Sequence, residues 1–175
     1  KAIVLKERGK HFDPEIVEHF GEAEKRPHLR ARIEDLGAGR LKDMDEGGID
    51  IQVLSLTNAF ENGCAWCMAF HSAGALKDGL SKEEVDRLRA GAAPVDARLR
   101  ALSNFSRSMM RNRGSVSQKD LEAFYAGGFT KAQALEVVLG AGFSVMANFA
   151  GHLVHAPLGL PFEPHVWTKP GGATD

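Results

Sequence analysis

Two cysteines and a histidine follow one another at helical spacing in the segment Cys64-Ala-Trp-Cys67-Met-Ala-Phe-His71, and the chain has no other cysteine. The Asn62-Gly63 pair ahead of them is a turn or helix-start signal, and the segment then runs to Gly79 with one isolated glycine on the way. The i, i+3, i+7 spacing therefore predicts that the three side chains share one face of a helix, with both cysteines in or near its first turn.

This placement favours redox chemistry at the two thiols. Unpaired backbone N–H groups and the positive end of the helix dipole stabilise a thiolate, and they lower a cysteine pKa that is about 8.5 in a free chain. His71 stands one turn after Cys67, where it can accept the thiol proton or hold the thiolate as an ion pair. A thiolate, a nearby base and a second thiol are the groups that peroxide reduction requires.

Two other interpretations of the motif stay open. A structural zinc site would need two further ligands besides Cys64 and Cys67, and the candidates are His71 with His152 or His155. Alternatively, both cysteines are inert and pack as small hydrophobic residues. The histidine four residues after the second cysteine favours the redox dithiol over both.

Bulk composition narrows the class of protein. The 175 residues include 22 Lys plus Arg and 23 Asp plus Glu, so there is no excess of positive charge of the kind that nucleic-acid binding needs. A secreted domain stapled by disulfides would have more than two cysteines, and Lys1–Lys6 lacks the long apolar region of a secretory signal. We therefore expect a cytoplasmic protein that binds neither nucleic acid nor membrane.

Helix-start signals follow the motif at regular intervals and predict an all-α fold. Ser81-Lys-Glu-Glu84 and Thr130-Lys-Ala-Gln133 match the capping box, in which a hydroxyl and a distal side chain satisfy each other's backbone N–H groups. Between them, further helices are expected over Pro94–Arg111 and from Ser117 to Gly127.

The last predicted helix, Gln133–His155, is apolar on nearly every side. Glu136, Ser144 and Asn148 interrupt it, which predicts a buried helix rather than a membrane span. A domain of about five helices has little material to cover such a helix on all sides. A second copy of the chain is therefore expected to cover part of it, which predicts a homo-oligomer.

The motif and its surroundings resemble the alkylhydroperoxidase AhpD / carboxymuconolactone decarboxylase family. The resemblance rests on Asn62–Ser72 and continues through Ala75–Ser81, Arg113–Ser117, Gly128–Gln133 and Asn148–His152. It implies an all-helical trimer or hexamer that reduces alkyl hydroperoxides, in which Cys67 attacks the peroxide, Cys64 resolves the sulfenic acid and His71 assists proton transfer. It also implies an external thiol or dithiol as reductant and no built-in cofactor. The wider family includes decarboxylase or lactone-processing enzymes without the dithiol, and a zinc-stabilised helical interaction module is the alternative from another class.

One residue departs from the peroxidase pattern. Such peroxidases carry a glutamate twelve residues before the first motif cysteine as part of a proton relay, and this chain has Gln52 there. Since an amide cannot shuttle a proton, the resemblance implies weak peroxidase activity. Glu61 is a possible substitute, although it is expected to lie in a solvated loop.

The front of the chain carries a second resemblance. Leu29–Gly37 and Arg40–Thr57 resemble the opening of a decarboxylase-type amidohydrolase barrel, but nothing barrel-like follows, so we expect no amidohydrolase activity. The predicted organisation is an N-terminal extension over residues 1–48, an AhpD-like domain over 49–167 and a flexible tail over 168–175. The segment around Ile49–Leu56 has β-branched residues typical of a strand, yet it lacks a partner strand, and we expect a helix.

Overall fold

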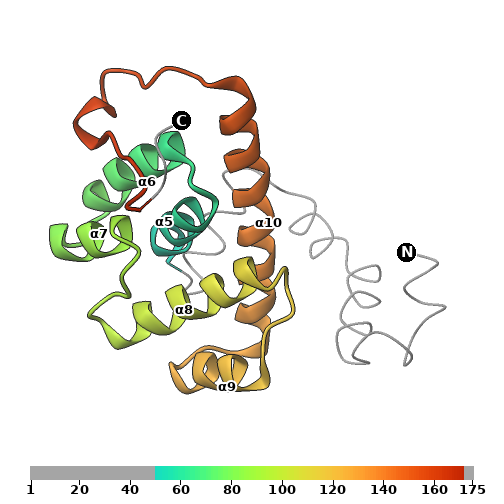
Figure 1. Cartoon of the computed structure of the whole chain (residues 1–175). Coiled ribbons are helices and arrows are strands. Elements are labelled where there is room, and N and C mark those ends of the chain that lie inside the picture. Colours follow the sequence, from blue (N-terminus) through green and yellow to red (C-terminus); the bar gives the residue numbers. More distant parts are fainter. Residues whose placement is uncertain (1–49, 172–175) are drawn as a thin grey trace, which may run out of the picture. The chain divides into compact units, whose positions relative to one another are not determined.

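The computed structural model describes residues 50–171, and this part of the chain is all-helical, as predicted (Figure 1). It contains six α-helices, a short 3-10 turn and no strand among these residues. The predicted N-terminal extension, residues 1–48, lies outside the described residues, as do the last four residues of the expected tail. The elements are α5 (Ile51–Asn62), α6 (Ala65–Lys77), α7 (Lys82–Arg89), α8 (Ala97–Arg111), α9 (Gln118–Ala126), α10 (Lys131–Val154) and η1 (Glu163–His165).

Helix α5 is the central element, packed against α6, α7, α8 and α10. Asp50 caps its start by accepting a hydrogen bond from the Val53 backbone N–H at 2.9 Å, and Gly63 ends it in the left-handed conformation at φ 72°. All residues from Val53 to Ala59 are buried. The helix prediction for this segment is confirmed. The β-branched residues that resemble a strand are accommodated because burial on every side, rather than intrinsic propensity, decides the conformation.

Polar side chains tie α5 to its neighbours inside the core. The Asn58 amide donates to Ser144 of α10 at 3.1 Å and accepts from Ser106 of α8 at 2.6 Å. Thr57 bonds Ser103 of α8 at 2.9 Å. Because every one of these buried groups has a partner, the network fixes the register of α8 and α10 against α5 without an unpaired polar atom.

The predicted helix starts are present, with one correction. Thr130 and Gln133 form the complete capping box at the start of α10. Ser81 caps α7, but Glu84 does not reach back to it; its carboxylate instead accepts the backbone N–H groups of Val95 and Asp96 at 2.9–3.0 Å. Asp96 in turn caps α8, so that helix starts after Asp96 rather than at Pro94.

The chain after α10 returns to α6 and α7. Trp167 is buried, its indole N–H donates to the Arg89 carbonyl at 2.8 Å, and its ring packs against Phe60. The Arg89 guanidinium bonds the carbonyls of His165 and Val166 at 3.0 and 2.8 Å. These contacts hold the segment that passes over the first turn of α6.

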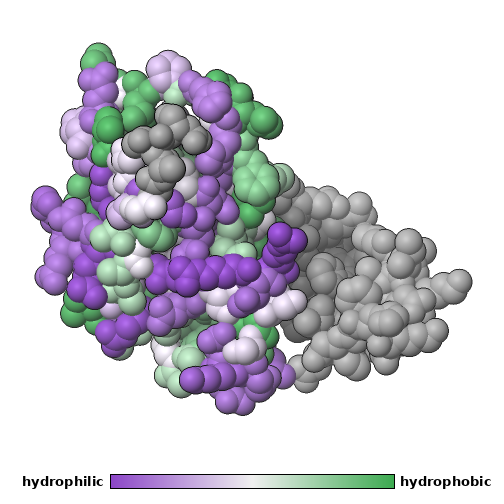
Figure 2. Space-filling view, viewed as in Figure 1, coloured by the Kyte–Doolittle hydropathy of each residue, from purple (hydrophilic) through white to green (hydrophobic). Residues whose placement is uncertain are grey.

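One side of α10 is apolar and exposed, so the helix is not buried on all sides within one chain. Figure 2 shows hydrophobic side chains along the edge that α10 forms in Figure 1. By length and composition α10 could cross a membrane, with a mean hydropathy of 1.6, so the prediction that it is too polar to do so is wrong. Buried Ser144 and Asn148 nevertheless join its opposite side to the core. The exposed apolar residues are Leu135, Val138, Phe143, Met146, Phe149, Leu153 and Val154.

Candidate redox site

The structure brings the two cysteines together at the start of α6. Cys64 is the residue that caps this helix, and its sulfur accepts the Cys67 backbone N–H at 3.3 Å. The two sulfur atoms lie 2.8 Å apart, and both residues are buried. A disulfide has a sulfur–sulfur distance of about 2.05 Å, so the pair can close with a small side-chain movement.

The two thiols have opposite electrostatic environments. The two sulfurs share one S–H hydrogen bond, and this bond together with the Cys67 backbone N–H outweighs burial and lowers the pKa of Cys64 to about 6. The same shared bond, together with burial, raises the pKa of Cys67. Of the two thiols, Cys64 is therefore the one whose ionisation the surroundings favour. The family resemblance implies the opposite order of reactivity.

Helix α10 completes the surroundings of the sulfurs. A Cβ atom at Gly151 would lie 3.1 Å from the Cys64 sulfur and 4.0 Å from that of Cys67, so any larger residue here would press on the Cys64 sulfur. The Asn148 side chain bonds the Cys67 sulfur and opposes the rise of its pKa. Asn62 orients Asn148 by donating to its carbonyl oxygen at 2.7 Å. From the sequence, none of these three residues was expected to take part in the chemistry of the thiols.

His71 of α6 contacts Gln52 of α5. The Gln52 amide nitrogen donates to the Asp78 carboxylate at 2.8 Å, which turns its oxygen toward His71 Nδ1 at 3.0 Å. Because that oxygen can only accept, Nδ1 carries the proton and Nε2 is the free base. Gln52 therefore lies in hydrogen-bond contact with the motif histidine.

Burial lowers the pKa of His71 to about 4, so it is neutral at pH 7. A neutral imidazole can accept a proton but cannot hold a thiolate as an ion pair. The structure is therefore compatible with His71 as a base that accepts the thiol proton, and not with His71 as a permanently charged partner of the thiolate.

Glu61 does not lie in a solvated loop, and that expectation is wrong. It belongs to the last turn of α5, and its side chain is only 11% exposed. Arg107 bonds one carboxylate oxygen at 2.9 Å, and Arg111 bonds both, at 2.7 and 3.0 Å. The carboxylate thus joins α5 to α8 and is directed to these arginines rather than to Gln52 and His71.

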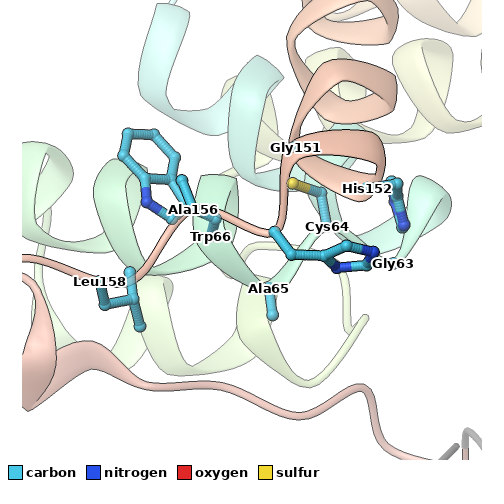
Figure 3. Close-up of a pocket in the computed structure, with 9 residues that line it drawn as sticks. Gly63, Cys64, Ala65, Trp66, Gly151, His152, Ala156 and Leu158 are labelled. Carbon is cyan, nitrogen blue, oxygen red and sulfur yellow. The ribbon is translucent and has the colours of Figure 1, made fainter.

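A pocket of about 340 Å³ opens above Cys64 (Figure 3). Cys64, Trp66, Gly151 and His152 line it, together with Ala156 and Leu158 of the segment after α10. Cys67 does not line it. Trp66 stacks on Phe70 with ring centroids 5.4 Å apart, which gives one side of the pocket a rigid aromatic support. The pocket gives a small molecule access to one sulfur of the pair.

Within residues 50–171, no group of three or more His, Cys, Asp or Glu side chains is arranged to hold a metal ion. The zinc interpretation needs Cys64 and Cys67 to converge with two histidines. His71 instead bonds Gln52, and His152 Nε2 bonds the Asn62 carbonyl at 3.1 Å. The arrangement fits a dithiol better than a structural zinc site.

Fold and site together define an all-helical domain with a buried pair of thiols at the start of one helix. The model of the carboxymuconolactone decarboxylase family matches residues 27–107, which confirms the family resemblance and includes the cysteine motif. The match begins ahead of the predicted domain start at residue 49. A solved structure described as an uncharacterized peroxidase-related protein from Silicibacter sp. TM1040 has the same fold, with a TM-score of 0.57 and 18% sequence identity. That comparison covers 89% of this chain and 90% of the other. No curated protein matches the chain.

The lowered pKa of Cys64 predicts how alkylation depends on pH. Iodoacetamide reacts with thiolates, so the reduced protein should be alkylated at Cys64, with a rate that rises through a midpoint near pH 6 and levels off above it. Below that pH Cys64 is protonated and the rate falls. Mass spectrometry of the alkylated peptide identifies the residue. A midpoint near 8.5, the value of a free cysteine, would contradict the proposed electrostatics.

Proposed function

We propose that this protein is a thiol-dependent peroxidase or related thiol–disulfide oxidoreductase that reduces alkyl or small hydroperoxides. The observation that carries the proposal is the contact between the two sulfurs at 2.8 Å, at a helix start where one of them has its pKa lowered to about 6. Inert core cysteines need neither a shared proton nor an opening to solvent. The match to the carboxymuconolactone decarboxylase family supports the same choice at a coarser level.

The reaction consumes two electrons from the dithiol. A cysteine thiolate attacks the terminal peroxide oxygen, the O–O bond breaks, and an alcohol leaves once it has taken up a proton. The sulfenic acid then condenses with the second thiol to give the disulfide and water. An external thiol or dithiol restores the reduced pair by exchange. The pair can carry these steps without a bound cofactor.

His71 and Gln52 are proposed to manage a proton. The free Nε2 of neutral His71 can accept the thiol proton, while Gln52 and Asp78 fix its tautomer through the chain of two hydrogen bonds. Gln52 cannot take the proton onward, which limits the relay to a single ionisable group. Weak activity is the expected consequence.

A second candidate is a carboxymuconolactone-decarboxylase-type reaction, which the description of the matching family favours. Such a reaction would not consume the thiols. The two candidate functions therefore differ in whether the activity depends on the cysteines.

A peroxide-consumption assay tests the proposal. With dithiothreitol as reductant, the reduced protein should consume cumene hydroperoxide catalytically, and Cys64→Ser/Cys67→Ser should consume none above the uncatalysed rate. Lys82→Ala is a suitable control because Lys82 is exposed on α7 and pairs with Asp86 one turn further along the same helix. Equal activity of the double variant and the parent would reject the dithiol function.

The position of Gln52 predicts which variant strengthens the activity. Glutamate at 52 alone would face the Asp78 carboxylate, and two like charges so close cannot both ionise. In the Asp78→Asn background, Gln52→Glu should instead raise peroxide reduction by roughly 10-fold. This is less than the roughly 10²–10⁴-fold that is typical of general acid–base catalysis, because the site did not form around that charge. Asp78→Asn alone is the control. No increase in the double variant would show that the residue beside His71 does not limit the rate.

We propose that the chain forms a homo-oligomer in the cytoplasm, a trimer or hexamer according to the family resemblance. From Val137 to Val154 helix α10 has no charged residue, and its outward side chains are apolar while Ser144 and Asn148 face the core. This arrangement indicates that a second copy covers the outward side. Multi-angle light scattering should give a multiple of 19.0 kDa, and Met146→Glu with Phe149→Glu should shift the mass toward one chain. A parent mass of one chain at micromolar concentration would reject the proposal.

A further inference from the structure

The chain between α10 and η1 crosses to α6 and supplies two residues of the pocket wall, Ala156 and Leu158 (Figures 1 and 3). We propose that residues 156–162 form a flap that opens and closes over Cys64, with Arg89 anchoring the far end of the segment. The flap controls the access of bulky molecules to this sulfur. Its place in catalysis rests on the proposed thiol function, but access to Cys64 is measured without any enzymatic activity.

The flap has few bonds to its surroundings. Residues 156–161 form no hydrogen bond to any other part of the described chain. The bond from the Phe162 N–H to the Gly159 carbonyl, at 2.9 Å, closes a turn within the segment. Every residue from 156 to 161 is exposed except Leu158, which is half-buried. A segment with few buried contacts and no backbone bonds to its neighbours opens at a low cost in free energy.

Phe162 holds the flap against α6. Its ring packs on Trp66 and Phe70, with centroids 6.0 and 5.2 Å apart. Trp66 also lines the pocket, so the ring beneath the flap is part of the candidate site. Aromatic contacts of this kind stabilise the closed position modestly, which keeps it reversible.

The closed position leaves one buried donor without a partner. The Trp66 indole N–H is buried and bonds no group within residues 50–171. A buried N–H group nearly always has a partner, and an unpaired one costs free energy that contact with water restores. Movement of Phe162 away from the indole would let water reach this group. Ring contacts therefore favour the closed flap and the unpaired donor opposes it, a balance that favours exchange between two positions.

The two ends of the flap are fixed in different ways. The residue ahead of it, His155, has φ 48°, a left-handed conformation that strains a residue with a Cβ atom. Beyond the flap, the Arg89 guanidinium bonds the carbonyls of His165 and Val166 at 3.0 and 2.8 Å, and the Trp167 indole bonds the Arg89 carbonyl at 2.8 Å. Hydrogen bonds from a charged group are stronger than those between neutral groups, so Arg89 is the anchor.

Two prolines and a glycine determine how freely the flap moves. Pro157 and Pro161 each have a fixed φ, which stiffens the segment on both sides of Gly159. Gly159 has the greatest backbone freedom of the residues between them. A Cβ atom there would lie 3.8 Å from the nearest atom, the Pro161 Cδ, which is an ordinary contact. Alanine therefore fits at this position in the closed flap.

Alkylation by two maleimides of different size tests the flap. N-ethylmaleimide is small enough to enter the pocket, whereas the rigid, bulky dye of fluorescein maleimide requires the flap to open. Both carry the same reactive group, so the ratio of the fluorescein maleimide rate to the N-ethylmaleimide rate cancels any change in the thiol pKa. The ratio is measured at the Cys64 peptide of the reduced protein by mass spectrometry. The parent should give a much lower ratio than glutathione, and an equal ratio would overturn the proposal.

Phe162→Ala and Arg89→Ala should each raise this ratio, because one removes the ring contacts and the other releases the anchored end. The expected increase is about 10-fold, the factor that one aromatic contact or one hydrogen bond to a charged group typically represents. Leu160→Ala is the matched control within the flap, since Leu160 is 80% exposed. Arg87→Ala is the control on α7, since Arg87 bonds the Ala93 carbonyl instead.

Both controls should keep the ratio within about 2-fold of the parent. An unchanged ratio in Phe162→Ala and Arg89→Ala would overturn the flap, and so would an equal increase in the controls.

Gly159→Ala tests the flap without removing any contact. It lowers the backbone freedom that the segment gains on opening, so it should reduce the ratio by roughly 2- to 5-fold. A ratio that does not fall would contradict an opening motion centred on this segment, even where Phe162→Ala or Arg89→Ala fails to fold. None of these measurements uses a peroxide, so a parent that consumes no hydroperoxide would reject the proposed function and leave the test of the flap intact.

Discussion

The packing of α10 across the junction between α5 and α6 is the contact from which the candidate site takes its geometry. Gly151 lets the two backbones approach until the Cys64 sulfur touches α10, and Asn148 and His152 then stand on either side of that contact. Asn62, the last residue of α5, bonds both of them. A cysteine pair at a helix start can occur in many folds. Here a third helix places Asn148 against the Cys67 sulfur and Gly151 against the Cys64 sulfur, so the two sulfurs have different neighbours.

The electrostatics of the site follow from burial as much as from charge. Both thiols are buried, so two thiolates side by side would be costly, and a single negative charge shared through one S–H proton is the favourable state. The same burial keeps His71 neutral. The thiolate is therefore held mainly by hydrogen bonds, from the Cys67 S–H and backbone N–H, rather than by a fixed buried cation. This leaves His71 free to act as a base on one side of α6.

Local signals in the sequence were sufficient for the helices and for the cysteine motif. Capping residues such as Thr130 and Ser117 act within one turn, so their partners are readable from spacing alone. Two of the wrong expectations involve partners on another helix or at its start. Glu84 bonds the start of α8 instead of its own cap, and Glu61 meets two arginines of α8.

The same limit explains why α10 had no assigned part in the chemistry. Asn148, Gly151 and His152 are separated from the cysteines by more than 80 positions, and nothing local distinguishes an asparagine that bonds a sulfur from one that caps a core hydroxyl. The orientation of Gln52 depends in the same way on Asp78, which lies on a different element. Spacing identifies which residues share a helix, but the identity of the facing helix is a property of the whole chain.

One face of α10 packs in the core beside the cysteines, and the opposite face is apolar and exposed. Oligomer assembly and the geometry of the candidate site therefore depend on the same helix. Ser144, Asn148 and Gly151 point inward and must keep their register for the sulfurs to keep their partners. Met146, Phe149 and Leu153 point outward and are exposed in one chain. Since His152 lies in the last turn, next to residues of the outward face, a second copy that covers this face would also restrain the end of α10 that lines the pocket. Burial of the apolar side chains would then stabilise the same helix turn on which the positions of Gly151 and His152 depend.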